Sequence, residues 1–183
     1  MLGVYSGEQK GATVFFRNRS LLRTLTQLLE ALAQHPPQRL RILFHSASIG
    51  AEAYSFAIWR QMHGLHRQFA LEIVTTDINS EFLDFARNAR YPANVLQTMA
   101  AEESAYFELV GENEVTPAET IRCMEGFLPA MSFLEPMAPA CEVVMVLNAL
   151  TYVSEMEQGL AIRRIAEYNS RYLVIHRISS RYD

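Results

Sequence analysis

Two acidic residues, Glu52 and Asp77, stand where a small-molecule site would need them. Asp77 follows the apolar segment 71–76, and Glu52 comes just after a tight turn of mostly small residues at 46–50 that leads into a helix-forming stretch. Small residues allow the backbone to come close to a ligand, and a carboxylate at a neighbouring strand end can accept hydrogen bonds from both hydroxyls of a ribose. The spacing therefore predicts a nucleoside-binding site whose charged end meets the loop backbone and the start of the helix.

Alternating strands and helices are the elements that would position these two carboxylates. Apolar runs predict strands at residues 40–44, 71–76, 143–147 and 171–178, with a weaker candidate at 120–124. Periodic apolar residues predict helices at 20–34, 50–62, 80–89, 101–109 and 155–168, the third capped by Ser80, and a turn at 111–114. This order predicts an α/β fold with a doubly wound, mostly parallel sheet and helices on both faces.

Length and composition predict one globular domain over residues 1–183, with an N-terminal segment and helix at 1–38 and an α/β core at 39–183. The chain has 183 residues, of which 50% are hydrophobic and 20% are charged. A chain of this length buries enough surface to fold without disulfides or metals. Cys123 and Cys141 are expected to be reduced core thiols, and His63 and His66 lack a third ligand, so we expect no metal site.

Charge and hydropathy along the chain bear on location and partners. Residues 1–20 contain no apolar stretch typical of a secretory signal, and the most apolar segment, 143–153, is too short to span a bilayer. We therefore expect a cytoplasmic protein without membrane insertion. The net charge is −4, and the acidic residues gather in the middle of the chain, which argues against binding of nucleic acid. The basic N-terminal segment is either a solvated helix face or a surface for an acidic partner.

Five short motifs follow one another along residues 13–152. They are Thr13-Val14-Phe15-Phe16-Arg17, the segment SIGAEAYS at 48–55, the segment TDIN at 76–79 with Ala86-Arg87 and Tyr91 after it, the pair Tyr106-Phe107, and the segment LNALTY at 147–152. In this order they resemble the T-x-F-F-R, S-T-G-E-E-P-Y-S, T-D-I-D, Y-F and R-N-V-L-I-Y motifs of the chemotaxis receptor methyltransferases. The chain is identified as a divergent and truncated member of these CheR-type enzymes.

The resemblance implies a fold, a cofactor and a reaction. CheR-type enzymes use S-adenosylmethionine to methylate glutamate side chains on bacterial chemoreceptors, with S-adenosylhomocysteine as the product. We therefore expect a Rossmann-like class I methyltransferase sheet, S-adenosylmethionine as the cofactor, and a protein acceptor such as the cytoplasmic domain of a chemoreceptor, in chemotaxis-type signal transduction. A glutamate carboxylate is already an anion at neutral pH and needs no general base, so such a site works by positioning.

The resemblance also assigns site residues. It places cofactor contacts at Thr13, Arg17, Ser46, Ala47, Glu52, Asp77, Phe127, Leu128 and Asn148. Asp77 would hold the ribose and Glu52 the ammonium group of the cofactor, while Phe127 would press against the adenine. Arg17 and Tyr152, as the catalytic residues, would flank the transferred methyl group and hold the acceptor carboxylate.

Each of these residues also has a purely structural interpretation. Asp77 would then cap the turn into the helix at 80–89, and Glu52 would be a first-turn carboxylate favoured by the helix dipole. Arg17 would be a surface cation and Tyr152 a packing residue. The aromatic residues near the motifs are expected in the hydrophobic core: Phe15, Phe16, Tyr54 and Trp59.

The sequence departs from the family pattern at several positions. Ala51 stands where the family has the first glutamate of its pair, Leu147 replaces an arginine, and Phe127 falls where an asparagine contacts adenine. We also expect the C-terminal antiparallel hairpin and the small β-subdomain to be missing. These losses leave a second hypothesis, a catalytically inactive domain that senses the cofactor or acts as a scaffold in a signalling assembly. A homodimer contact or a partner chain is expected to cover the sheet edge at 171–178.

Overall fold

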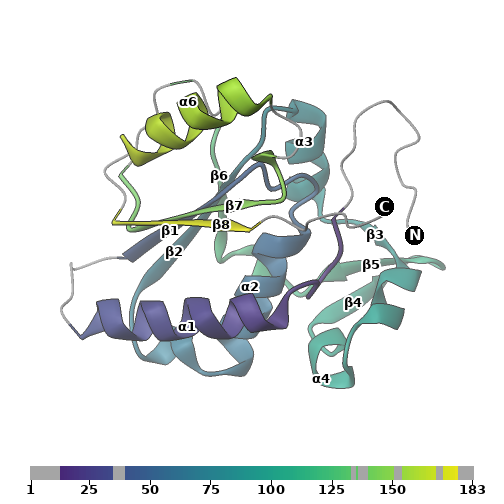
Figure 1. Ribbon diagram of the computed structural model, residues 1–183. Helices are drawn as coiled ribbons and strands as arrows, with labels where there is room; N and C mark the ends of the chain where they lie inside the picture. Colours follow the sequence, from purple (N-terminus) through teal and green to yellow (C-terminus); the bar gives the residue numbers. More distant parts are fainter. Residues whose placement is uncertain are drawn as a thin grey trace, which may run out of the picture.

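A central parallel sheet organises the structure, a computed structural model that describes residues 13–34, 40–132, 135, 140–150, 154–167 and 171–176. Its strands, within these residues, are β1 (Leu40–His45), β2 (Leu71–Thr76), β6 (Glu125–Phe127), β7 (Val143–Leu147) and β8 (Tyr172–His176). They lie in the order β6-β2-β1-β7-β8, and every neighbouring pair is parallel (Figure 1). The prediction of an α/β fold with a mostly parallel sheet is confirmed.

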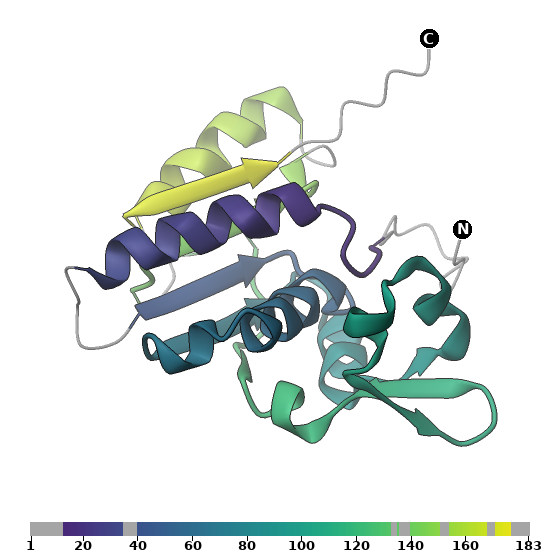
Figure 2. The same ribbon diagram turned by 90° about the horizontal axis from the view of Figure 1, so that it is seen from below.

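Helices cover both faces of this sheet (Figures 1 and 2). Helices α1 (Arg19–Ala33) and α2 (Ala51–Met62) lie on one face and α6 (Glu155–Ala166) lies on the other. The strand residues alternate accordingly, because successive side chains of a strand point to opposite faces. In β1, Phe44 joins the core under α1 and α2, whereas Leu43 joins the core under α6.

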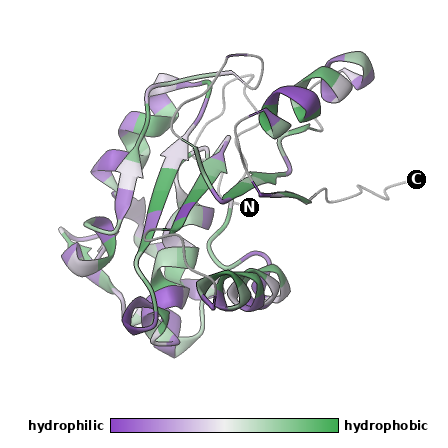
Figure 3. Ribbon diagram, turned by 90° about the vertical axis from the view of Figure 1, so that its left-hand side faces the viewer, coloured by the Kyte–Doolittle hydropathy of each residue, from purple (hydrophilic) through white to green (hydrophobic). Residues whose placement is uncertain are grey.

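The hydrophobic core explains how α1 packs against the sheet. One stripe of the helix is buried and consists of Leu22, Leu25, Leu29 and Leu32. Figure 3 shows largely hydrophobic strands between helices that carry both hydrophobic and hydrophilic residues. The aromatic residues that we expected in the core are buried: Phe15, Phe16, Tyr54 and Trp59.

Of the two cysteines, Cys141 is buried as predicted, but Cys123 is exposed. No helix in the described part of the chain is long and apolar enough to cross a membrane.

A second, smaller sheet was not predicted. Strands β3 (Tyr91–Pro92), β4 (Phe107–Val110) and β5 (Glu114–Pro117) pair antiparallel in the order β3-β5-β4. We predicted a helix over residues 101–109, but α4 covers only Ala101–Ser104 and the chain then enters β4. Gly111, at φ 76°, lies in the turn between β4 and β5 and lets these short strands pair. The expectation that the chain lacks a small β-subdomain is therefore corrected, because a small antiparallel β unit is present.

Two further local predictions were wrong. Residues 120–124, predicted as a weak strand, lie within and just after α5 (Glu119–Arg122), a helical turn that buries Ile121. In α3 (Ser80–Asn88), the N-cap is Asn79 rather than Ser80, because the Asn79 side chain accepts a hydrogen bond from the backbone two residues later at 2.8 Å. Two short 3-10 helices, η1 (Leu65–Arg67) and η2 (Ala93–Thr98), complete the connections.

Strand β8 is the edge of the large sheet in the part of the chain that the structure describes. Its only recorded neighbour there is β7, and no antiparallel hairpin joins the large sheet within the same residues. Tyr172 and Ile175 on this strand are 42% and 41% exposed. An open edge invites pairing with another strand. That a homodimer contact or a partner chain covers this edge stays a prediction.

Glu125 is expected to make the stability of the fold depend on pH. The carboxyl group of this β6 residue is buried, and burial raises its pKa from 4.5 to about 8, although a hydrogen bond from the Thr75 hydroxyl opposes the shift. The folded chain therefore retains a proton that the unfolded chain has released. The stability from this proton is complete below pH 4.5 and is lost as the pH rises through about 8.

We expect the melting temperature of the wild type to fall over that pH range. Glu125→Gln keeps a neutral side chain at every pH, so its melting temperature is expected to fall less, leaving a difference of roughly a few degrees at pH 8. Thermal unfolding followed by circular dichroism measures both slopes. Parallel slopes for the two proteins would show that the carboxyl group does not titrate in this range.

Candidate functional site

The loop between β1 and α2 turns sharply at the carboxyl end of β1. Ser46 and Ser48 adopt left-handed backbone conformations, at φ 59° and 53°, and Gly50 follows at φ 82°. Left-handed geometry costs a non-glycine residue of order 1 kcal/mol, and such strain gathers at functional sites. The Ala47 N–H donates to the Thr76 carbonyl oxygen at 3.0 Å. This bond ties the predicted loop to the end of the neighbouring strand, β2.

Asp77 follows β2, and two backbone donors fix its carboxylate. Oδ2 accepts a hydrogen bond from the Ser48 N–H at 2.8 Å, and Oδ1 accepts one from the Asn79 N–H at 2.9 Å. The residue is 6% exposed, and burial raises its pKa while the backbone hydrogen bonds oppose the shift. The two carboxylate oxygens together have about four acceptor sites, so the group can accept a hydrogen bond beyond those from the backbone. Asp77 therefore caps the turn into α3 and also has the chemistry needed to hold a diol.

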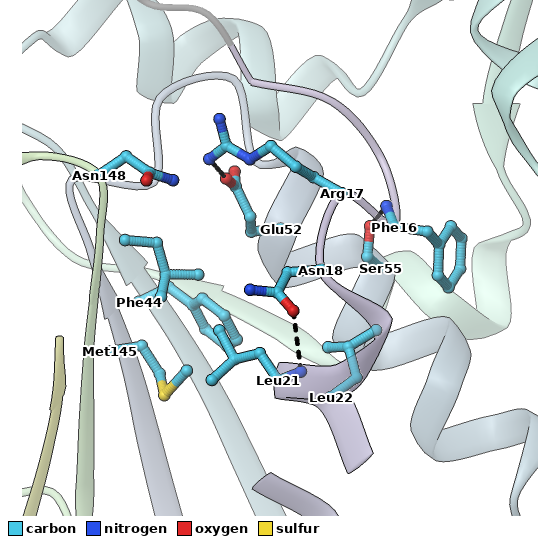
Figure 4. A pocket seen from close by; sticks show the side chains of 11 residues that line it. Phe16, Arg17, Asn18, Leu21, Leu22, Phe44, Glu52, Ser55, Met145 and Asn148 are labelled. Atoms are coloured by element: carbon cyan, nitrogen blue, oxygen red, sulfur yellow. Dashed lines mark hydrogen bonds and ion pairs between the residues drawn. The ribbon is translucent and has the colours of Figure 1, made fainter. Parts of the chain in front are cut away.

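Glu52, in the first turn of α2, is bound by the N-terminal segment. The Arg17 guanidinium forms an ion pair with one carboxylate oxygen (Figure 4), and the Thr13 hydroxyl donates to the other. Burial raises the pKa of Glu52, and the positive charge of Arg17 opposes the shift. The Arg17 side chain is 23% exposed. It is therefore not the solvated surface cation of the structural interpretation.

A pocket lies between the start of α1 and the carboxyl ends of β1 and β7 (Figure 4). It contains about 410 Å³ of empty space, part of which is open to solvent. Its polar lining consists of Arg17, Glu52, Asn18, Asn148 and Ser55, and the other lining side chains are apolar. The lining residues are Phe16, Arg17, Asn18, Leu21, Leu22, Phe44, Glu52, Ser55, Met145, Leu147 and Asn148. Asn148 directly follows β7 and has a left-handed backbone, at φ 58°.

Phe127 and Leu128 lie at the carboxyl end of β6, the strand next to β2. The Arg87 guanidinium carbon is 5.4 Å from the centroid of the Phe127 ring, a cation–π arrangement. The Leu128 N–H donates to the Thr75 carbonyl oxygen at 2.9 Å, and the Leu128 side chain packs on the core under α6. The two residues therefore flank the end of β2, with the Phe127 ring packed on the opposite core.

The structure brings the predicted site residues together in two groups. Thr13 and Arg17 both contact Glu52, and Asn148 lines the same pocket as Arg17 and Glu52. The second group is the Ser46–Ala47 loop with Asp77, which does not line that pocket and lies at the adjacent strand end. Tyr152 falls outside the described residues. No group of three or more metal-binding side chains occurs in the part of the chain that is described.

Sequence reasoning missed three groups that hold the site in shape. The Ser48 N–H fixes Asp77, and the Ser55 hydroxyl accepts a hydrogen bond from the Phe16 N–H at 2.9 Å, which attaches the N-terminal segment to α2. Asn18 caps α1 by accepting a hydrogen bond from the backbone at 3.0 Å and lines the pocket. Ser48 and Ser55 are the first and last residues of the motif at 48–55, and Asn18 has a typical N-cap side chain. The residue types were therefore visible in the sequence, but the partners that they bind were not.

Comparisons with known proteins were made against families, curated proteins and solved structures. Residues 11–175 match the family described as "CheR methyltransferase, SAM binding domain". The chain has no match among curated proteins.

Several solved methyltransferase structures are similar to this chain. The glycopeptide N-methyltransferase MtfA shares 11% identity, with a TM-score of 0.49 over 88% of this chain and 56% of that one. Magnesium protoporphyrin IX methyltransferase (ChlM) from Synechocystis PCC 6803 shares 14%, with a TM-score of 0.42 over 86% and 57%. An S-adenosylmethionine-dependent methyltransferase from Mesorhizobium loti shares 15%, with a TM-score of 0.37 over 77% and 48%. The chain thus spans about half the length of these proteins.

Proposed function

We propose a protein-carboxylate methyltransferase function for this chain, which belongs to the CheR methyltransferase family through its S-adenosylmethionine-binding domain. The acceptor we propose is a glutamate side chain of a signalling protein, such as the cytoplasmic domain of a bacterial chemoreceptor. The family membership supports the assignment of the cofactor and of the reaction class. The residues of the pocket and of the β2 end support the assignment of individual roles.

The observation that carries the proposal is the pair of opposite charges at the pocket, Arg17 and Glu52. The amino-acid tail of S-adenosylmethionine is a zwitterion, with an ammonium group and a carboxylate. A carboxylate next to a guanidinium offers a counter-charge to each of them. Asp77, whose carboxylate is fixed by backbone N–H groups at the adjacent strand end, supports the placement of the ribose there. The residues present therefore fit the cofactor at both of its polar parts.

Positioning is the chemistry that the chain itself would supply. S-adenosylmethionine, when bound, supplies an electrophilic methyl group on a sulfonium sulfur. Arg17 lines the pocket beside Glu52, and the planar fork of a guanidinium binds a carboxylate through two N–H donors, so this side chain would hold an acceptor carboxylate in line with that methyl group. The apolar lining, which includes Leu21, Phe44 and Met145, excludes water from the negatively charged acceptor. The role of Tyr152 as a second contact to the acceptor stays a prediction.

Transfer of a labelled methyl group tests the proposed reaction. The protein is incubated with S-[methyl-³H]adenosylmethionine and a receptor cytoplasmic fragment. We expect the fragment to become labelled and mild base to release this label as methanol. Base hydrolyses a glutamate methyl ester but does not remove an N-methyl group. Base-stable label would contradict a carboxylate acceptor. Binding of S-adenosylhomocysteine without any transfer would favour the cofactor-sensing alternative, to which Ala51 and Leu147 point.

Arg17→Ala separates acceptor positioning from cofactor binding. The variant removes charge-assisted hydrogen bonds to the acceptor, so we expect the rate of methyl transfer to fall more than tenfold beyond any loss of binding, a factor of about ten per bond lost. Single-turnover transfer rates and calorimetric binding of S-adenosylhomocysteine measure the two effects separately. Equal losses of rate and affinity would contradict the acceptor role. Arg163→Ala, on the exposed surface of α6, is the matched control.

A further inference from the structure

A second ion pair lies beside the segment that carries Arg17. Arg19, the first residue of α1, donates from Nε to Oε1 of Glu103 at 2.7 Å and from Nη2 to Oε2 at 2.6 Å. Glu103 belongs to α4, next to the small antiparallel sheet, and is 3% exposed. It also accepts a hydrogen bond from the Ala100 N–H at 2.8 Å. The two hydrogen bonds fix both side chains in one geometry across 84 residues of sequence.

The same guanidinium also holds Phe16. Its Nη1 donates to the Phe16 carbonyl oxygen at 3.2 Å, and its central carbon lies 5.5 Å from the centroid of the Phe16 ring. From the other side, the Phe16 N–H donates to the Ser55 hydroxyl at 2.9 Å. Both backbone polar groups and the ring of Phe16 are therefore occupied by fixed partners.

Phe16 needs this support because its backbone is left-handed, at φ 52°. For a bulky side chain this conformation is unfavourable and persists only where the surroundings enforce it. Phe16 directly precedes Arg17, so its backbone angles decide which way the Arg17 side chain leaves the chain. In the structure that direction leads to Glu52 in the pocket (Figure 4).

We propose that Arg19 and Glu103 are positioning residues, which hold Phe16 in its left-handed conformation and thereby aim Arg17 at Glu52. The effect on cofactor affinity and transfer rests on the proposed function, whereas the effect on the orientation of Arg17 does not. One consequence is that α4, beside the small sheet, is connected to the pocket through three consecutive contacts. A ligand that displaces Glu103 would therefore change the orientation of the Arg17 side chain.

The charge of the pair and the burial of Glu103 argue that this ion pair fixes a conformation and is more than a surface contact. Burial opposes ionisation of Glu103, but the hydrogen bonds from Arg19 and from the Ala100 N–H outweigh it and lower the pKa. The carboxylate therefore stays charged at neutral pH. Removing one member of such a pair leaves the other without its partner, which costs more than the loss of an exposed ion pair.

The test uses two variants in the full chain. Glu103→Gln keeps the shape but removes the charge, and Arg19→Lys keeps the charge but cannot bond Glu103 twice and Phe16 at the same time. Glu167→Gln, in the exposed Arg164–Glu167 pair of 3.0 Å, is the matched control. The affinity for S-adenosylhomocysteine is measured by calorimetry. The NMR signal of the Arg17 Nε–H, assigned by its loss in Arg17→Ala, reports the pairing of Arg17 with Glu52 in the absence of any ligand.

We expect both variants to bind S-adenosylhomocysteine about tenfold more weakly, with the Arg17 signal moved toward that of free arginine and the control unchanged. A lowered melting temperature with affinity and Arg17 signal unchanged would show a merely structural pair and overturn the proposal. Should the wild type bind no S-adenosylhomocysteine, the proposed function fails, and the Arg17 signal alone decides whether the pair positions Arg17. Arg19→Lys keeps the test decisive if Glu103→Gln does not fold.

Discussion

Replacing Asp77 by alanine is expected to weaken the binding of S-adenosylhomocysteine about a hundredfold. The variant removes the acceptor for both ribose hydroxyls, and each hydrogen bond to a carboxylate contributes roughly 1.5–3 kcal/mol. It also frees the Ser48 N–H, which the carboxylate holds at 2.8 Å, so the strained loop loses one of its links to the end of β2 and keeps the bond from Ala47 to Thr76. Isothermal titration calorimetry of the wild type and the variant measures the change.

Two companion variants separate the ribose contact from the loop. Asp77→Asn keeps an oxygen for the Ser48 N–H but loses the charge, so we expect a smaller loss, about tenfold. Asp84→Ala removes another carboxylate from the same region. Asp84 lies in α3, its side chain is 68% exposed, and it forms an ion pair with Arg87. The Asp84→Ala variant is expected to bind like the wild type. If Asp77→Ala binds S-adenosylhomocysteine as tightly as the wild type, the proposal that the ribose lies at the end of β2 is wrong.

Gly50→Ala is expected to lower the free energy of unfolding by about 3 kcal/mol. Gly50 has a left-handed backbone, at φ 82°, and an added Cβ would lie 3.0 Å from the Cβ of Ala86 and 3.2 Å from the ring of Tyr54. Both neighbours are themselves fixed, because Tyr54 is buried and its hydroxyl donates to the Ala86 carbonyl oxygen at 2.9 Å. Urea denaturation measures the loss. The loop that follows β1 is expected to shift with it.

Gly64→Ala is the control for this variant. Gly64 is also left-handed, at φ 68°, but nothing lies within 4 Å of an added Cβ. Its substitution is therefore expected to cost only the conformational strain, about 1 kcal/mol. The difference between the two glycines isolates the close packing between α2 and α3. Equal costs would mean that Ala86 and Tyr54 move aside freely.

The parallel sheet was predictable because the residue types within each strand indicate a strand without reference to the rest of the chain. Residues 143–147 are apolar and mostly β-branched, as a strand buried on both faces must be, and the predicted limits agree with β7. The positions of the two acidic site residues were also predictable from the sequence. Glu52 and Asp77 were assigned from their places after a loop and after a strand, and both are held by specific partners.

The small sheet could not be predicted from local pattern. Residues 107–110 read Phe-Glu-Leu-Val, a stretch that follows helix-forming alanines and glutamates and is equally compatible with the end of a helix. Pairing with residues 114–117 across the turn at Gly111 decides for a strand. Context beyond the local segment overrides propensity there.

The detailed contacts of the site were also out of reach of the sequence. The Ser48–Asp77 bond joins residues 29 apart, and the Arg19–Glu103 pair joins residues 84 apart. Nothing in the local sequence of Arg19 distinguishes it from a solvent-exposed cation at the start of a helix. Only the packing of α4 against the start of α1 brings a buried carboxylate to it.

A crystal structure of the chain with S-adenosylhomocysteine tests the central claim most directly. We predict that the ribose hydroxyls lie within hydrogen-bond distance of the Asp77 carboxylate and that the ammonium group lies against Glu52, with the amino-acid tail in the pocket beside Arg17. A nucleoside bound away from the end of β2, or an amino-acid tail that does not enter the pocket, would contradict the account.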